Sequence, residues 1–303
     1  MRHFLSFVDL SPNELESVLD RAASLKAGAT SDAMLNRIAV MLFEKPSLRT
    51  KLSFTVAARK LGGEAIYFGG QEVGLGYREP AEDVARVVSR MADVAIVRTF
   101  AQATLEDFAS CATIPVVNAL TDNEHPCQAL ADLLTIKEIV GNLKAARVVY
   151  LGDGNNVASS LALALASSGA HYSVASPDGY DIPRSVITLA EQLALKTGST
   201  INEYRDAKEA VQDANFVYTD VWTSMGQEDE STKRKAIFAD YAVTPALLDL
   251  ARKDVRFMHD LPAHPGEEIT PGLLDDPRSI VFDQAENRLW AQAALLELLV
   301  DRN

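Results

Sequence analysis

The sequence predicts an α/β protein of two domains, each a mostly parallel sheet flanked by helices. The chain has 303 residues, which is roughly twice the ~150 residues of an average domain. Apolar residues make up 48% and charged residues 23%, a balance typical of soluble globular proteins. Short apolar runs alternate with helix-like segments along the whole chain. That alternation is the pattern of parallel sheets covered by helices on both faces.

The first half of the chain contains four predicted strands, each followed by a predicted helix. Short apolar runs predict strands at residues 38–43, 65–68, 94–97 and 115–118. The segments between and after them are predicted to be helices at residues 50–61, 80–91, 105–112 and 126–140. Gly62 and Gly63 provide a C-terminal stop signal for the first of these helices.

The same alternation begins again after Gly141 and Asn142, which mark the predicted domain boundary. Strands are predicted at residues 146–151, 171–175, 216–218 and 255–258. Helices are predicted at residues 156–168, 183–197, 209–214 and 289–300. The pattern alone leaves open which domain the last helix packs against.

The composition limits the classes of function. The chain has 29 Lys and Arg against 42 Asp and Glu, a net charge of −13, which argues against a general nucleic-acid binder. The net charge does not exclude a small anionic substrate, because a local basic pocket can exist within an acidic surface. Two cysteines, Cys111 and Cys127, cannot build a disulfide framework and fit a reducing compartment. With no signal peptide or membrane-length apolar segment recognised, we expect a cytoplasmic protein.

The segment 43–50 lies between a predicted strand and a predicted helix and suits an anion. A helix N-terminus offers unpaired backbone N–H groups and the positive end of the helix dipole. Ser47 and Thr50 add hydroxyl groups, and Arg49 adds a guanidinium fork suited to phosphate. The alternative is an ordinary helix cap beside a solvated arginine.

Three further polar side chains lie near predicted strand ends or helix starts. Arg98 directly follows a predicted strand, where ligands of open α/β sheets gather, although a salt bridge is the competing interpretation. His125 can donate a hydrogen bond to a polarised carbonyl, and Gln128 lies one turn further on. By themselves, these two residues favour the ordinary interpretation, a histidine near a helix cap and an exposed glutamine.

Segment 152–156 contains a Gly-x-Gly turn, which is weak evidence for dinucleotide binding. The third small position of that motif is occupied by Val157, and no acidic residue clearly ends the following strand. The turn can equally present Asn155 and Asn156 to a ligand.

Two segments supply carboxylates after late strands. In segment 220–227, Asp220 is suited to an ammonium ion, although a capped loop explains the segment as well. Segment 259–264 has two histidines and an aspartate whose spacing matches no strong zinc pattern, so we predict no metal site. Arg288, near the last helix, is either a ligand contact or a charge flanking that helix.

Taken together, these segments resemble the aspartate/ornithine carbamoyltransferase family, and on the acceptor side its ornithine-specific members. The matching segments occur in the family order at residues 43–50, 125–128, 152–156, 220–227, 259–262 and 282–288. Each is weak alone, but six in order and spacing are highly specific. The resemblance covers residues 4–299.

The resemblance implies the carbamoyltransferase fold and transfer of a carbamoyl group from carbamoyl phosphate to the δ-amine of ornithine. Residues 1–140, joined by the C-terminal helix 285–303, would bind carbamoyl phosphate, and residues 141–284 would bind ornithine. It also implies a homotrimer, or a multiple of trimers, with active sites near subunit interfaces. The loop 71–79 would reach a neighbouring subunit. No metal and no organic cofactor is implied.

The family pattern also implies a role for each matched position. Carbamoyl phosphate would be bound by Ser47, Leu48, Arg49, Thr50, Arg98, His125, Gln128 and Arg288. Ornithine would be bound by Asn155, Asn156, Asp220, Ser224, Met225, Asp260 and Leu261. The catalytic residues among them would be Arg98, His125 and Asp260.

Two positions depart from the family pattern. Leu48 replaces the usual threonine, a mild change because its backbone N–H can still face phosphate. Asp260 replaces the usual cysteine, and a second carboxylate near Asp220 would favour the ammonium form of the acceptor. This predicts an activity optimum at higher pH.

Three alternatives stay open at this stage. The acceptor could be another amine, such as an N-acylornithine, lysine or putrescine. The chain could be a catalytically silent homologue, although it retains five convergent polar residues at Arg49, Arg98, His125, Gln128 and Arg288. A nucleotide-dependent oxidoreductase rests on residues 152–154 alone.

Overall fold

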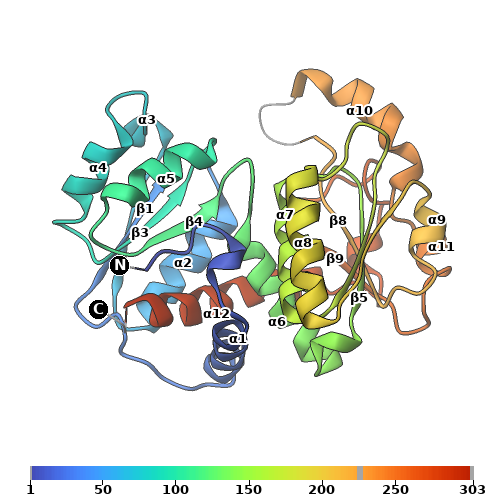
Figure 1. The fold of residues 1–303 in the computed structure, drawn as a ribbon, viewed down its shortest axis with the longest axis horizontal. Coiled ribbons are helices and arrows are strands. Elements are labelled where there is room, and N and C mark those ends of the chain that lie inside the picture. Colours follow the sequence, from blue (N-terminus) through green and yellow to red (C-terminus); the bar gives the residue numbers. More distant parts are fainter. Residues whose placement is uncertain (1, 224–227, 301–303) are drawn as a thin grey trace. The chain divides into compact units, whose positions relative to one another are not determined.

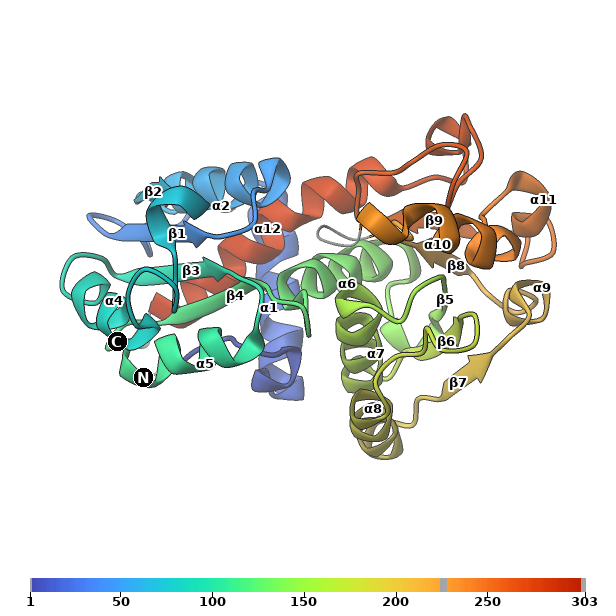
Figure 2. The same ribbon diagram turned by 90° about the horizontal axis from the view of Figure 1, so that it is seen from above.

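The computed structural model describes residues 2–223 and 228–300. The chain forms two compact units, one of Met1–Leu134 with Glu286–Asn303 and the other of Thr135–Ala285. Each unit contains one parallel sheet with helices on both faces (Figures 1 and 2). This confirms the predicted fold class.

The sheet of the first unit has the strand order β2-β1-β3-β4, and all its pairings are parallel. Its strands are β1 (Ile38–Phe43), β2 (Glu64–Phe68), β3 (Val94–Arg98) and β4 (Val116–Leu120). The helices from this part of the chain are α1 (Pro12–Lys26), α2 (Leu48–Lys60), α3 (Gly70–Val73), α4 (Ala81–Val88), α5 (Gln102–Cys111) and α6 (Pro126–Val140).

Helices α4 and α5 cover one face of this sheet and bury Leu105 and Phe108 against its strands (Figure 2). The last helix, α12 (Val281–Val300), lies beside α1 and α2. Arg21 of α1 donates from Nε to Glu297 Oε2 over 2.5 Å, and the Lys60 ammonium lies 4.9 Å from the Trp290 ring centroid. The final helix is therefore part of the first unit over most of its length.

The sheet of the second unit has the order β7-β6-β5-β8-β9, again with parallel pairings. Its strands are β5 (Arg147–Leu151), β6 (His171–Ala175), β7 (Ile201–Tyr204), β8 (Phe216–Thr219) and β9 (Arg256–His259). The helices after α6 are α7 (Asn156–Ser168), α8 (Arg184–Thr197), α9 (Ala207–Ala210), α10 (Ser231–Phe238) and α11 (Pro245–Leu248). Helices α7 and α8 cover one face, and α9 and α11 pack into the core on the other (Figure 2).

Several elements differ from the sequence prediction. Helix α1 was not predicted, although Ser11 and Glu14 form a capping box, which is a sequence signal for a helix start. Strand β7, at the sheet edge, was not predicted because its two central residues, Asn202 and Glu203, are polar and exposed and interrupt the apolar run. The helix expected at 209–214 is instead the single turn α9. Helix α12 begins at Val281 rather than 289, because its first two turns are largely polar and hide the amphipathic pattern.

The order of strands puts the segments predicted to bind ligands at the carboxyl ends of neighbouring strands. In the first sheet the chain direction across the sheet reverses between β1 and β3, and in the second between β5 and β8. Ligands of open parallel sheets bind outside the carboxyl ends of the strands at such switch points. The segments after β1 and β3, and after β5 and β8, are those that the sequence singles out. Among the described helices, none combines the length and apolar character needed to cross a membrane.

Candidate active site

The N-terminus of α2 forms the centre of the predicted phosphate site. Ser47 is the N-cap residue, and its Oγ accepts the Thr50 backbone N–H over 3.3 Å. The same hydroxyl donates to Thr50 Oγ1 over 2.9 Å. The helix begins at Leu48, so Arg49 and Thr50 lie in its first turn, where N–H groups favour anions. The Leu48 side chain is 77% exposed, which leaves its backbone as the group able to face a ligand.

Arg288 of α12 reaches the same helix end. Its Nη2 donates to Thr50 Oγ1 over 2.5 Å, and the residue is 3% exposed. Arg98 ends β3 and is likewise buried. The first unit thus brings a helix N-terminus together with a buried guanidinium, an arrangement that favours a small dianion.

His125 lies just before α6 and is buried. Burial, with help from the positive charges of Arg288 and Arg98, holds its pKa well below the usual 6.5. The imidazole is therefore neutral at physiological pH and can donate one N–H to a carbonyl oxygen.

Gln128, in the first turn of α6, is also buried, but its amide group donates to Asp132 Oδ1 over 2.8 Å. This side chain is already engaged by a neighbour, and its predicted ligand contact would fall to the amide oxygen.

A cavity of about 440 Å³ opens at the carboxyl ends of β1 and β3. It is lined by Glu44, Gly70, Gly74, Leu75, Tyr77, Thr99, Phe100, Ala101 and Thr104. This lining includes neither Ser47 nor Thr50, so we place the anion site at the α2 N-terminus, on its chemistry, rather than in this cavity. The cavity is instead bordered by part of the loop 71–79.

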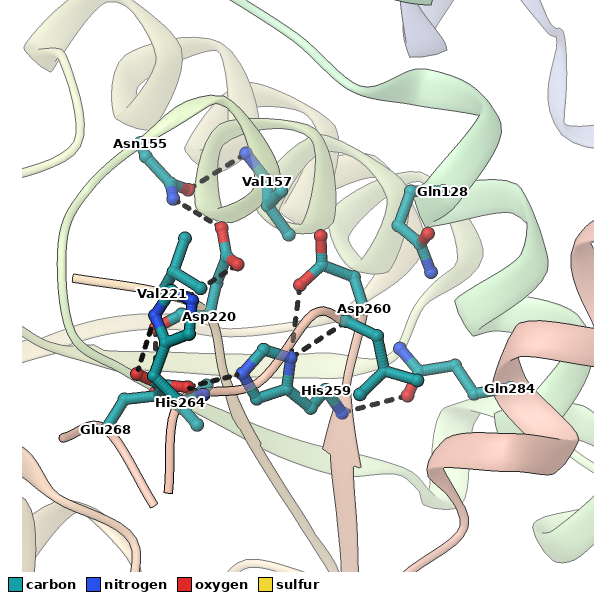
Figure 3. Close-up of polar contacts among 12 residues, drawn as sticks. Gln128, Asn155, Val157, Asp220, Val221, His259, Asp260, His264, Glu268 and Gln284 are labelled. Atoms are coloured by element: carbon teal, nitrogen blue, oxygen red, sulfur yellow. Dashed lines mark hydrogen bonds and ion pairs between the residues drawn. The ribbon is translucent and has the colours of Figure 1, made fainter. Parts of the chain in front are cut away.

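The residues predicted to bind the acceptor lie in the second unit, where Asp220 follows β8 and Asp260 follows β9 (Figure 3). Asp220 Oδ2 accepts from Asn155 Nδ2 over 2.7 Å, and its Oδ1 accepts the Val221 N–H over 2.6 Å. Asn155 is also the N-cap of α7, with its Oδ1 accepting the Val157 N–H over 2.9 Å. Asn155 therefore orients Asp220 from a fixed position.

The two carboxylates influence one another. Burial, and next the nearby charge of Asp260, raise the pKa of Asp220 well above its usual 3.8. The pair therefore resists carrying two negative charges by itself. An ammonium group placed between them would relieve that repulsion, as expected for a diamine acceptor.

His259 lies beneath these carboxylates at the end of β9, with no exposed surface (Figure 3). Its Nε2 lies 3.3 Å from Glu268 Oε1, and its Nδ1 accepts the Leu261 N–H over 2.9 Å. Burial lowers the pKa of His259, but hydrogen bonds with Asp260 and Glu268 outweigh burial and raise the pKa to about 9. The Leu261 N–H opposes protonation, because it needs a lone pair on Nδ1. Nδ1 thus faces two groups: the neutral ring accepts the Leu261 N–H there, and the imidazolium donates to the Asp260 carboxylate at 3.5 Å.

Two groups of side chains within the described residues have donor atoms close enough for one metal ion. Asp220, His259 and Asp260 form one, and His264, Glu267 and Glu268 form the other. In the first, Asn155, Val221 and Leu261 already use the lone pairs of Asp220 and His259. In the second, Glu267 pairs with Lys235 over 2.8 Å. We assign a metal to neither.

The remaining predicted acceptor residues are placed unevenly. Asn156 is the first residue of α7, and Leu261 lies in the turn after β9 with φ of 60°. Ser224 and Met225 lie outside the described residues. The sequence prediction missed Arg234 of α10, a buried guanidinium that pairs with Asp153 and donates to the Trp222 carbonyl. Arg234 lies in a charged run whose appearance is that of a solvated helix, so no signal distinguishes it.

Gly154 argues against the dinucleotide interpretation of segment 152–156. A Cβ atom at this position would lie 2.2 Å from the backbone of Asp181 and Ile182. Its N–H also donates to the Tyr180 carbonyl over 2.8 Å. The glycine is thus needed for close approach of the chain's own backbone, where a nucleotide-binding loop would leave space for a pyrophosphate.

Two family models match consecutive parts of the chain. Residues 2–138 match the family model of the aspartate/ornithine carbamoyltransferase carbamoyl-P binding domain, and residues 144–299 match that of the Asp/Orn binding domain. The ornithine carbamoyltransferase of Acidothermus cellulolyticus is 48% identical, over 99% of this chain and 97% of that protein. The anabolic ornithine carbamoyltransferase of Pseudomonas aeruginosa is also 48% identical, over 99% and 98%.

The similarity extends to solved structures. Ornithine carbamoyltransferase from Pyrococcus furiosus superimposes with a TM-score of 0.96 at 44% identity, covering 99% of this chain and 97% of that one. An N-acetyl-L-ornithine transcarbamylase variant is more distant, with a TM-score of 0.90 at 28% identity, covering 99% and 100%. With both family models matched over almost its full length, the chain belongs to the aspartate/ornithine carbamoyltransferase family.

Proposed function

We propose that this protein is an ornithine carbamoyltransferase, which transfers the carbamoyl group of carbamoyl phosphate to the δ-amine of L-ornithine. The products are citrulline and phosphate. The observation that carries the proposal is that the two units carry opposite charges at their sites. The first has a buried arginine, Arg288, at a helix N-terminus, and the second has two neighbouring carboxylates, Asp220 and Asp260. The full-length similarity to curated ornithine carbamoyltransferases supports the same acceptor.

The reaction begins with the neutral δ-amine attacking the carbonyl carbon of bound carbamoyl phosphate. A C–N bond forms and negative charge develops on the carbonyl oxygen. Arg98, neutral His125 and Thr50 would stabilise that oxyanion. The C–O bond to phosphate then breaks, and Ser47, Arg49 and the α2 N-terminus hold the leaving dianion.

No dedicated protein base is needed in this scheme, because a phosphate oxygen can accept the proton that the amine loses. Positioning two bound reactants can by itself contribute about 7–11 kcal/mol to lowering the barrier. We expect ordered binding, with carbamoyl phosphate first. Equal ornithine affinity in the presence and absence of carbamoyl phosphate, measured by calorimetry, would refute the order.

The acceptor choice rests on Asp220, with Asn155 and Asp260 beside it. Putrescine lacks an α-carboxylate and would leave part of an amino-acid site unsatisfied, a mismatch that discriminates strongly. The relevant experiment offers ornithine, N-acetylornithine, lysine and putrescine with carbamoyl phosphate and quantifies ureido product. Ornithine is expected to give the highest kcat/KM. A higher value for any of the others would replace ornithine in the proposal.

We further propose a homotrimer, or a multiple of it, with loop 71–79 reaching a neighbouring subunit. Leu48 and Leu52 lie one turn apart on α2 and are 77% and 59% exposed, and Tyr77 of the loop is 95% exposed. Apolar side chains this exposed are typical of surfaces that an assembly covers. Light scattering after size exclusion tests the proposal, and a monomer at micromolar concentration would contradict it.

We also propose that the protein works in the cytoplasm and in the biosynthetic direction. Cys111 and Cys127 are free thiols, as expected in a reducing cytoplasm. An anabolic direction, towards citrulline, is favoured by the name of the Pseudomonas aeruginosa relative.

A further inference from the structure

A buried histidine–glutamate pair lies behind the acceptor carboxylates, and the proposed reaction assigns it no role. His259 and Glu268 both have 0% exposed surface. A buried carboxylate is costly unless it is hydrogen-bonded. Glu268 Oε1 is held by His259 Nε2 at 3.3 Å and by the backbone N–H of His264. One oxygen of the glutamate, Oε1, therefore accepts from both the imidazole and the His264 backbone.

The other edge of the imidazole meets the turn that carries Asp260. Nδ1 lies 2.9 Å from the Leu261 nitrogen and 3.5 Å from Asp260 Oδ1 (Figure 3). Leu261 has φ of 60°, a left-handed conformation that costs free energy for a residue with a side chain. A turn of this kind persists only where neighbouring groups hold it, and His259 is such a group.

We propose that His259 and Glu268 are positioning residues of the acceptor site. Glu268 fixes the ring through Nε2, and Nδ1 holds the Asp260–Leu261 turn so that Asp260 faces Asp220. The inference rests on the proposed function only in taking this site as the one that binds the acceptor amine.

The arrangement holds the turn in either protonation state of the ring. With the proton on Nε2 alone, Nδ1 accepts the Leu261 N–H, as in the arrangement described. An imidazolium has no lone pair at Nδ1 and would instead donate to the Asp260 carboxylate. In both states Nε2–H faces Glu268, so the glutamate is the constant partner.

The test compares two amides that each replace one half of the imidazole. In His259→Asn the amide group lies near the position of Nδ1, and in His259→Gln it lies near that of Nε2. If Nδ1 holds the turn, His259→Gln raises the KM for ornithine about tenfold or more, the order expected when a buried amide loses its acceptor. His259→Asn is expected to recover most of that loss. Equal KM values for the two variants would overturn the proposal.

A second pair of variants tests Glu268. Glu268→Gln keeps an oxygen acceptor for the ring, whereas Glu268→Leu removes it while approximating the volume. We expect a larger rise in the ornithine KM for leucine than for glutamine. The KM for carbamoyl phosphate is the control for folding, because its proposed residues lie in the other unit. A parallel rise in both KM values would show a merely structural role and overturn the proposal.

Nitrogen-15 NMR of the histidine rings supplies a readout that needs no turnover. The protonated Nε2 of His259 is expected to change its resonance in Glu268→Leu, and an unchanged His259 spectrum would overturn the assignment of Glu268. A wild-type protein that does not use ornithine would refute the proposed function, whereas the NMR comparison would still decide this inference.

Discussion

Arg288 donates a hydrogen bond to Thr50 Oγ1 over 2.5 Å, although 238 positions separate the two residues in the chain. The bond joins the last helix to the first turn of α2 within one unit. It makes the anion site depend on both ends of the sequence.

Replacing Arg288 should therefore weaken carbamoyl phosphate binding selectively. A charge-assisted hydrogen bond contributes about 1.5–3 kcal/mol, so we expect Arg288→Gln to raise the KM for carbamoyl phosphate roughly 10- to 100-fold. Arg288→Lys keeps the charge without the planar fork and should recover only part of the loss. Exposed Arg86→Gln is the matched control. Steady-state kinetics that show no preferential effect on carbamoyl phosphate would argue against the assignment.

The lowered pKa of His125 predicts that the protein becomes less stable as the pH falls. Its folded pKa lies well below 6.5, chiefly through burial and then through Arg288 and Arg98. Below pH 6.5 the unfolded chain binds a proton that the folded chain does not. The free energy of unfolding should therefore fall with decreasing pH, by up to about 1.4 kcal/mol per pH unit from this group.

The difference between wild type and His125→Asn isolates that contribution. Urea denaturation between pH 7 and pH 5 should show a shallower loss of stability in the variant. The exposed Leu195→Asn, which changes no titratable group, serves as the control and should follow the wild type. Parallel curves for wild type and His125→Asn would show that His125 accepts a proton in the folded state.

The ionised Asp220 carboxylate is expected to lower the free energy of unfolding, although it is proposed to bind the acceptor amine. Burial and the charge of Asp260 raise its pKa, so the folded state favours the protonated form and ionisation above pH 3.8 costs stability. Asp220→Asn should raise the melting temperature at pH 7, and the gain should shrink near pH 4. The same variant should lose ornithine turnover. A lower melting temperature at pH 7 would contradict this view of the site.

Asp260 sets the expected pH optimum. Two carboxylates around the acceptor ammonium favour its charged form, whereas the attacking species is the neutral amine. Asp260→Cys should therefore move the optimum of kcat/KM for ornithine to lower pH. Asp260→Asn, which also removes the charge, should shift it in the same direction. Superimposable pH profiles for wild type and both variants would remove Asp260 from this role.

The sequence predicted the parts of the fold that apolar periodicity encodes. The strand 38–43 appears with the predicted bounds, because a buried parallel strand is a continuous apolar run. Strand β7 and helix α10 were not predicted, since edge position and a polar composition remove that signal.

The site was predictable to the extent that its chemistry lies in short segments. The pairing of Asn155 with Asp220 crosses 65 positions, and the contact between His259 and Glu268 is not part of any motif. Such relationships depend on the sheet order, which brings the ends of β5, β8 and β9 together. The sequence shows that a carboxylate follows a strand, but not which side chain orients it.

The most direct test of the account incubates the purified protein with carbamoyl phosphate and L-ornithine and measures citrulline and inorganic phosphate in the same samples. The account predicts enzyme-dependent formation of both products in equal amounts, abolished or strongly reduced in Asp220→Asn. Phosphate release without citrulline, or no product from ornithine at any pH between 6 and 10, would contradict it.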